Sequence, residues 1–167
     1  KWGYFPSLSA GWVVSNEPSF EPNNIISYLK LRASTGTLGN QNIANYAYIT
    51  LFSREGNITR YGNPSLRWES TTQHNVGLDM RLLNNKLDVT ADYFRKDTKD
   101  ILLLLNLPSF VGNVDPTYVN AGQISNEGRE LNARYRESVS EDFSFSIGGN
   151  VTRLRNRVSA LHPNVPR

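Results

Sequence analysis

The chain has 167 residues, a formal net charge of +3, 38% hydrophobic residues and no cysteine. The lack of cysteine excludes disulfides and thiolate metal sites, and the basic residues are too scattered to predict a nucleic-acid surface. No apolar run of about 18 residues occurs, so the sequence predicts no transmembrane helix. A hydrophilic average is still compatible with barrel strands, because they alternate lumenal polar with lipid-facing apolar residues.

Six segments in chain order alternate between apolar and polar residues. Period-two alternation is typical of β-strands, because successive side chains point to opposite faces of a sheet. In the clearest segment, Val76, Leu78 and Met80 share one face, while Gln73 and Asn75 share the other. That segment runs for about 16 residues, whereas strands in soluble domains usually have about five or six. The six predicted strands lie at residues 3–14, 26–36, 67–82, 86–103, 123–136 and 143–158.

The connections between these segments are of two kinds. Residues 83–86, Leu-Asn-Asn-Lys, predict a tight hairpin, because asparagine tolerates a positive φ, and residues 138–142 predict another short turn. Long connections rich in Gly, Asn, Pro and Tyr follow the second and fourth strands. Short turns at one end and long loops at the other are typical of outer-membrane barrels, in which the long loops face the cell exterior.

These patterns predict an all-β fold, an antiparallel transmembrane β-barrel segment of about six strands. The strand predicted at residues 67–82 then has its residue-67 end toward the cell exterior and its residue-82 end toward the periplasm. Two other readings of the pattern stay open. One is a passive outer-membrane pore or adhesion barrel, and the other is a soluble β-sandwich that binds carbohydrate.

Several ordered blocks point to a family. The sequence contains GYFPSLSAGW at residues 3–12, SYLKLRASTG and then GNQ within 27–41, NPSLRWE and TTQ within 63–73, and NAG with ISNEGREL within 120–131. Together they resemble the C-terminal part of the β-barrel of SusC/RagA-type TonB-linked (TonB-dependent) outer-membrane transporters. Residues 1–167 are accordingly expected to be a partial barrel domain of a larger chain, without its plug domain or terminal strands.

The resemblance implies a barrel of about 22 strands, which six strands cannot close. It implies an active importer of large nutrients, oligosaccharides or peptides, in contact with outer-membrane lipid. The implied partners are a SusD-like surface lipoprotein and TonB, the latter through an N-terminal part that lies outside this sequence. No cofactor and no nucleic-acid partner are expected.

Catalytic chemistry finds little support in the sequence. The two histidines, His74 and His162, are far apart in the chain, and no nucleophile motif or metal-spaced histidine pair occurs. We therefore expect no catalytic site, no metal site and no enzyme. Asp88 and Asp92 share a strand face, and we expect them to pair with basic residues of neighbouring strands rather than to act as an acid–base pair.

The candidate functional residues are polar or aromatic. Exposed rings can stack on sugars or hold peptide side chains, although they can equally fold a loop onto itself or contact the lipoprotein. The loop aromatics expected to contact substrate or partner are Tyr46, Tyr48, Phe52, Tyr61, Phe110 and Tyr118. The residues expected to line the lumen are Arg67, Glu69, Gln73 and Asn75, whose polarity is also explained by wetting alone.

Overall fold

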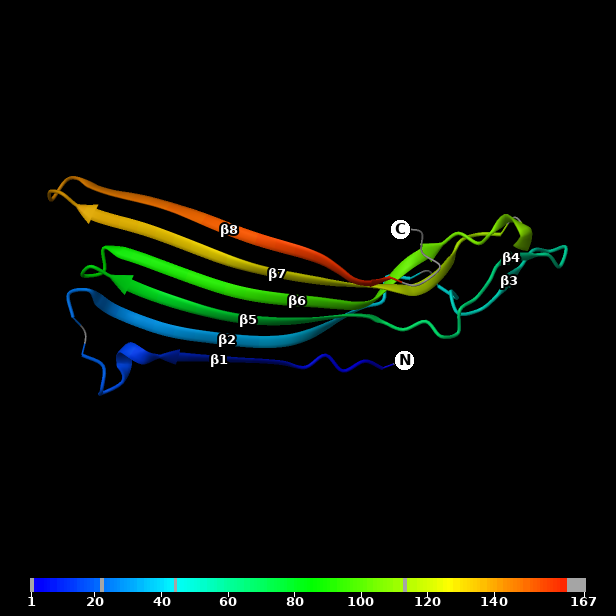
Figure 1. Cartoon of the computed structure of the whole chain (residues 1–167), viewed down its shortest axis with the longest axis horizontal. Helices are drawn as coiled ribbons and strands as arrows, with labels where there is room; N and C mark the ends of the chain where they lie inside the picture. Colours follow the sequence, from blue (N-terminus) through cyan, green and yellow to red (C-terminus); the bar gives the residue numbers. More distant parts are fainter. Residues whose placement is uncertain (1, 22, 44, 113, 162–167) are drawn as a thin grey trace.

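A single curved antiparallel sheet makes up most of the molecule (Figure 1). The computed structural model describes residues 2–21, 23–43, 45–112 and 114–161. The sheet has six strands in the order β1-β2-β5-β6-β7-β8. Their bounds are Ser7–Val13 (β1), Ile26–Asn40 (β2), Glu69–Leu82 (β5), Leu87–Leu105 (β6), Thr117–Ser138 (β7) and Ser144–Leu161 (β8). The predicted all-β antiparallel fold is confirmed.

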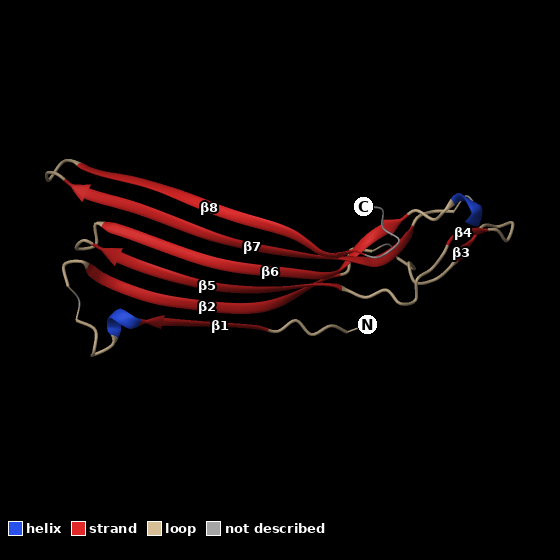
Figure 2. Ribbon diagram, viewed as in Figure 1, coloured by secondary structure: helices blue, strands red, loops and turns tan. Residues whose placement is uncertain are grey.

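The remaining elements are short (Figure 2). A separate two-stranded sheet, β3 (Leu51–Phe52) and β4 (Ile58–Arg60), lies within the long connection between β2 and β5. The 3₁₀ turns η1 (Val14–Asn16) and η2 (Ser109–Val111) are the helical elements of the described residues. Among those residues no helix has the length and apolarity needed to cross a membrane.

The strand register separates the side chains into two faces. Leu31 pairs with Leu78, and the same row continues through Ala91, Leu131 and Val151 across the sheet. Paired residues point to the same face, so this apolar row forms a continuous band, and Leu131 on it is 46% exposed. Polar residues occupy the opposite face. Of the described residues, the buried hydrophobic ones are Ala47, Leu66 and Ala121. The sheet therefore has no hydrophobic core of its own.

The short turns lie at one end of the sheet and the long connections at the other (Figure 1). In the hairpin between β5 and β6, Leu83, Asn84 and Asn85 all have positive φ, at 54°, 56° and 66°. The predicted hairpin with positive-φ asparagines is confirmed. The connection between β7 and β8 is also short, and Val139 donates its backbone N–H to the carbonyl of Phe143.

Several predicted strand ends are wrong. The first strand begins at Ser7 rather than residue 3, although Thr37 N–H still donates to the carbonyl of Pro6. The strand predicted at 67–82 begins at Glu69. Strand β7 begins at Thr117 rather than residue 123, so that Tyr118 lies in a strand and not in a loop.

A register irregularity explains why the alternation pattern missed the first residues of β7. Strands β6 and β7 shift register between Thr98 and Ile101 and shift back between Ile101 and Leu102, and Asp100 has a φ of 55°. An extra residue in one strand moves the following side chains to the other face, so the alternation breaks although the pairing continues. The apolar run from Ile101 to Leu105 carries no period-two signal either. The alternation pattern therefore does not predict the pairing of β6 with β7 beyond the bulge.

Candidate functional site

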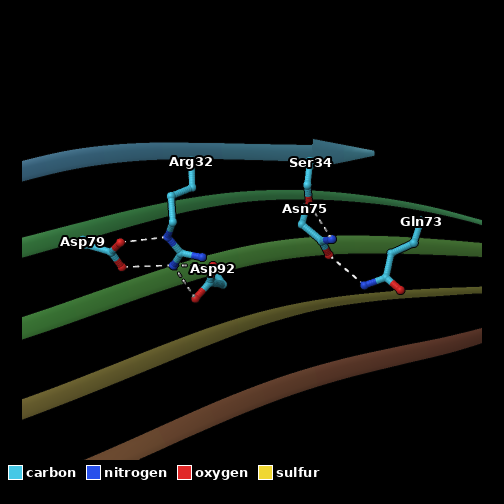
Figure 3. Close-up of polar contacts among 6 residues, drawn as sticks. All are labelled: Arg32, Ser34, Gln73, Asn75, Asp79 and Asp92. Carbon is cyan, nitrogen blue, oxygen red and sulfur yellow. Dashed lines mark hydrogen bonds and ion pairs between the residues drawn. The ribbon is translucent and has the colours of Figure 1, made fainter. Parts of the chain in front are cut away.

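An ion cluster lies on the polar face of the sheet (Figure 3). The guanidinium of Arg32 on β2 donates to both carboxylate oxygens of Asp79 on β5, through Nε at 2.8 Å and Nη2 at 3.0 Å. The same Nη2 donates to Asp92 on β6, at 3.0 Å to Oδ1. One arginine therefore links three strands, and its planar fork suits the bidentate contact with Asp79.

Glycine makes room for this cluster. A Cβ built on Gly77 falls 2.3 Å from Asp92 Oδ1 and 2.8 Å from Arg32 Cζ. Gly77 pairs with Arg32 on one side and with Asp92 on the other. Any side chain at position 77 therefore displaces the guanidinium, which lies across the sheet where that side chain projects.

A second polar chain lies next to the cluster on the same face (Figure 3). Gln73 Nε2 donates to Asn75 Oδ1 at 2.9 Å, and Asn75 Nδ2 donates to Ser34 Oγ at 3.0 Å. Glu69 lies nearer the long-loop end, where its carboxylate accepts from Asn40 Nδ2 at 3.5 Å and from the backbone N–H of Leu102 at 3.4 Å. Three of the four residues predicted to line the lumen thus share one polar face.

The expected pairing with basic residues of neighbouring strands is confirmed for Asp88, which forms ion pairs with Arg81 on β5 and Arg136 on β7. Asp92 also pairs with a basic residue, but Arg32 lies on β2, one strand further away. At the short-turn end, Lys86 Nζ donates to Glu137 Oε1 at 2.6 Å, and this hydrogen bond raises the pKa of Lys86. The lysine stays charged and attaches the β5–β6 turn to β7.

A partly open cavity of about 540 Å³ lies at the long-loop end. Tyr46, with a φ of 61°, and Tyr48 line it, together with Arg67 and Trp68. A positive φ costs a residue other than glycine about 1–2 kcal/mol, and such strain concentrates at functional sites. Arg67 therefore lies with the loop aromatics and not with Gln73 and Asn75. The cavity is lined by Gln41, Ile43, Asn45, Tyr46, Ala47, Tyr48, Pro64, Leu66, Arg67 and Trp68.

Two asparagines hold this cavity against the sheet. Asn120 on β7 accepts from the N–H of Arg67 at 2.9 Å and donates to the carbonyls of Arg67 and Asp100 at 2.9 and 2.8 Å. Its side-chain amide thus pairs both backbone groups of Arg67, as a neighbouring strand does. Asn63 donates through Nδ2 to the carbonyl of Tyr118 at 3.1 Å.

Gly62 allows a close backbone approach in the same loop. A Cβ at position 62 falls 2.3 Å from the carbonyl carbon of Ile49 and 2.5 Å from the backbone nitrogen of Thr50. Backbone atoms cannot move aside as the end of a flexible side chain can. The two sides of the loop therefore come together only with glycine at this position.

The other predicted aromatics lie apart from the cavity lining. Phe52 is on β3 and 62% exposed, and Phe110 is on η2 and 88% exposed. Tyr61 follows β4, and its carbonyl accepts from Thr117 Oγ1 at 3.0 Å. Tyr118, at the start of β7, contributes its carbonyl to Asn63. The structure therefore brings together Tyr46 and Tyr48 of the six.

The sequence reasoning missed the residues that organise the site. Arg32 and Asp79 are ordinary members of alternating strands, and they meet because the register places them diagonally, with Arg32 opposite Gly77 and Asp79 opposite Lys30. Asn63 and Asn120 lie within the NPSLRWE and NAG blocks, so the blocks themselves were the available signal. Within the described residues, no group of three or more His, Asp or Glu side chains is arranged to hold a metal ion.

Curated relatives match this chain over nearly all of its length. The TonB-dependent receptor SusC of Bacteroides thetaiotaomicron is 32% identical over 96% of this chain and 18% of SusC. The TonB-dependent receptor P3 of Formosa agariphila is 31% identical over 96% of this chain and 17% of the receptor. The chain thus spans less than a fifth of the length of these relatives.

Solved structures agree with the sequence relatives. A structure of the RagAB peptide transporter matches with a TM-score of 0.81 and 28% identity, over 96% of this chain and 18% of that one. The RagAB peptide importer in its closed-closed state matches with a TM-score of 0.83 and 27% identity, over 98% of this chain and 19% of that one. The family model described as "TonB dependent receptor-like, beta-barrel" matches residues 1–166. The chain therefore belongs to the TonB-dependent receptor β-barrel family.

Proposed function

We propose that this chain is part of the barrel wall of an active outer-membrane importer of large nutrients, oligosaccharides or peptides. The observation that carries the proposal is the two-faced sheet, which has an apolar band on one side and the Arg32 ion cluster on the other. A barrel strand in a membrane needs such an apolar outer and polar inner face. Residues 1–167 are then part of one barrel domain, and their role is transport rather than catalysis.

The names of the relatives support the substrate class and the partners. SusC is a TonB-dependent receptor, and RagAB is a peptide transporter. By analogy, this importer draws its energy through TonB and works with a SusD-like surface lipoprotein. The long-loop end, with its cavity, faces the cell exterior, and the short turns face the periplasm.

In this orientation the loop cavity is an early contact for cargo or lipoprotein. Tyr46 and Tyr48 offer rings that stack on sugars or hold apolar peptide side chains, and Arg67 offers a donor for carboxylates. Phe52, Tyr61, Phe110 and Tyr118 contribute less, because they lie outside the cavity lining. Below the cavity, Glu69, Gln73 and Asn75 line the polar route through the barrel.

Uptake by the full-length transporter tests the proposal. Cells carrying it are supplied with labelled peptides in one arm and labelled oligosaccharides in the other, with and without functional TonB. We expect uptake of one class only, and its loss without TonB. Uptake that continues without TonB identifies a passive pore instead. An intact protein that stays soluble without detergent contradicts the barrel altogether.

The cavity is tested separately in the same transporter. The double variant Tyr46→Ala/Tyr48→Ala is expected to bind cargo or lipoprotein roughly 30-fold more weakly, because two aromatic anchors of about 1 kcal/mol each contribute about 2 kcal/mol together. Phe143→Ala is the matched control, since it removes an exposed ring at the short-turn end. Equal binding by both variants contradicts the role of the cavity.

A further inference from the structure

A cluster of arginines lies on the apolar face of the sheet, toward the long-loop end. The strand register places Arg129 opposite Arg153, and Glu127 opposite both Arg95 and Arg155. Arg157 follows opposite Ser125. These five arginines, Arg95, Arg129, Arg153, Arg155 and Arg157, continue the rows of Leu131 and Val151. They are called the outer arginine cluster below.

The outer arginine cluster has more positive charge than its neighbours neutralise. Arg95 is paired with Asp97 at 2.9 Å, and Arg155 lies 3.9 Å from Glu127. Within the part of the chain that the structure describes, Arg129, Arg153 and Arg157 have no carboxylate at ion-pair distance. Three guanidinium groups are thus available to an anion on one face.

An apolar groove leads directly to this charge. The groove has a volume of about 430 Å³, and Arg129 and Arg153 border it at one end. Two smaller cavities, of about 310 and 250 Å³, lie among the arginines, and Glu127 lines both of them. The apolar lining of the groove is Leu31, Val76, Leu78, Ala91, Tyr93, Leu131 and Val151.

The height of the cluster fits the edge of a bilayer. From Phe143, just before β8, to Arg153 the chain advances about ten residues, or about 33 Å at the rise of a β-strand. A strand tilt of about 40° reduces this to about 25 Å, which is the height of the apolar band of outer-membrane barrels. Phe143 and Phe145 then lie at one boundary of the hydrocarbon, and Arg153 lies at the other.

We propose that the outer arginine cluster binds a phosphorylated lipid of the outer leaflet. An acyl chain lies in the apolar groove, and phosphate oxygens accept hydrogen bonds from Arg129, Arg153 and Arg157. The guanidinium fork matches phosphate oxygens in pairs, and clustered basic groups next to membrane-spanning segments suit anionic headgroups. The inference rests on the proposed function for its placement in the outer membrane with the long loops outside.

The test uses the full-length transporter, purified in detergent, and three defined probes. These are diphosphorylated lipid A, the same lipid without phosphates, and inorganic phosphate, each followed by native mass spectrometry or fluorescence titration. We expect the phosphorylated lipid to bind far more tightly than the dephosphorylated one. Inorganic phosphate at millimolar concentration should not displace it. Equal binding of the two lipids, or displacement by free phosphate, overturns the proposal.

Three variants locate the site, and two of them, the glutamine variant and the control, remove the same number of positive charges. The variant Arg129→Gln/Arg153→Gln/Arg157→Gln should weaken binding of the phosphorylated lipid roughly 100-fold. A conservative variant with lysine at the same three positions should recover part of the affinity through charge alone. The matched control replaces three basic residues of the polar face, Lys30→Gln/Lys96→Gln/Arg134→Gln, and should bind as the parent does.

The rival explanation is that these arginines form ion pairs with acidic residues of another strand and stabilise the barrel. In that case the glutamine variant unfolds at lower temperature while the ratio of affinities for the two lipids stays unchanged, and the proposal is overturned. Uptake is measured in parallel. TonB-independent uptake with intact lipid preference refutes the proposed function alone, and normal uptake with no effect of the glutamine variant on lipid preference refutes only this inference.

Discussion

Asn120→Ala tests how the loop cavity is attached to the sheet. The substitution removes one acceptor and two donor contacts, at 2.9, 2.9 and 2.8 Å, and leaves the β7 backbone in place. A typical intramolecular hydrogen bond contributes about 1 kcal/mol net. The two contacts to Arg67 are exposed, so water replaces part of their contribution. We expect a loss of about 2 kcal/mol in the local stability of this attachment.

Hydrogen exchange of the full-length transporter measures this loss directly. About 2 kcal/mol corresponds to roughly 30-fold faster exchange of the backbone amides around Arg67, because every 1.4 kcal/mol is a factor of about ten. Asn120→Asp keeps the acceptor for Arg67 N–H but loses both donors, so its exchange rate should lie between those of the parent and the alanine variant. Binding of cargo or lipoprotein should weaken in the same order.

The control is Asn156→Ala, which removes one exposed side-chain contact to Asn126 on the β7–β8 pair. It should leave exchange near Arg67 unchanged. The reasoning is refuted if Asn120→Ala changes that exchange less than about twofold, or if the control changes it equally. Either result means that the cavity is held by contacts other than the asparagine amide.

Three further substitutions probe the two faces and the loop. Arg32→Gln leaves Asp79 and Asp92 facing each other without their shared cation, and we expect a lower unfolding temperature that added salt partly restores, because these groups are partly exposed and screened. Gly62→Ala forces a backbone clash and should raise protease cleavage of the long loop without lowering the unfolding temperature of the barrel. Met80→Lys places a charge on the apolar face, in the row that continues through Val89, Ala133 and Gly149 about midway between Phe143 and Arg153, and should destabilise the barrel by about 2–4 kcal/mol. Thr90→Lys on the polar face should cost little in the same denaturant titration.

The sheet was predictable because its information is local. Each long strand carries its period-two pattern within its own residues, and the Asn84–Asn85 hairpin carries its turn chemistry. The bulge at Asp100 was not predictable, because it depends on how β6 meets β7. The alternation stops there, but pairing continues to Leu105 through backbone hydrogen bonds that require no particular side chain.

The site was less predictable than the sheet because it depends on contacts distant in sequence. Polar residues such as Gln73 and Asn75 were recognised from alternation alone, but the Arg32 cluster joins residues 47 and 60 positions apart. Among the loop aromatics, nothing local distinguishes Tyr46 from Phe110. Their difference is one of packing, since Tyr46 lies in a cavity wall while Phe110 projects from a short turn.

The absence of a core in this sheet changes what a substitution at an apolar position means. In a packed interior, Leu131→Val leaves a void, and the loss includes the cost of that void. On a face covered by fluid acyl chains, the lipid fills the space that the shorter side chain leaves. The loss is then only the smaller transfer free energy of the missing methylene. The apolar band thus requires hydrophobic side chains but no particular side-chain shape. Side-chain shape matters at Leu66 and Ala121, which are buried, because a lost or added methyl group there leaves a void or a clash.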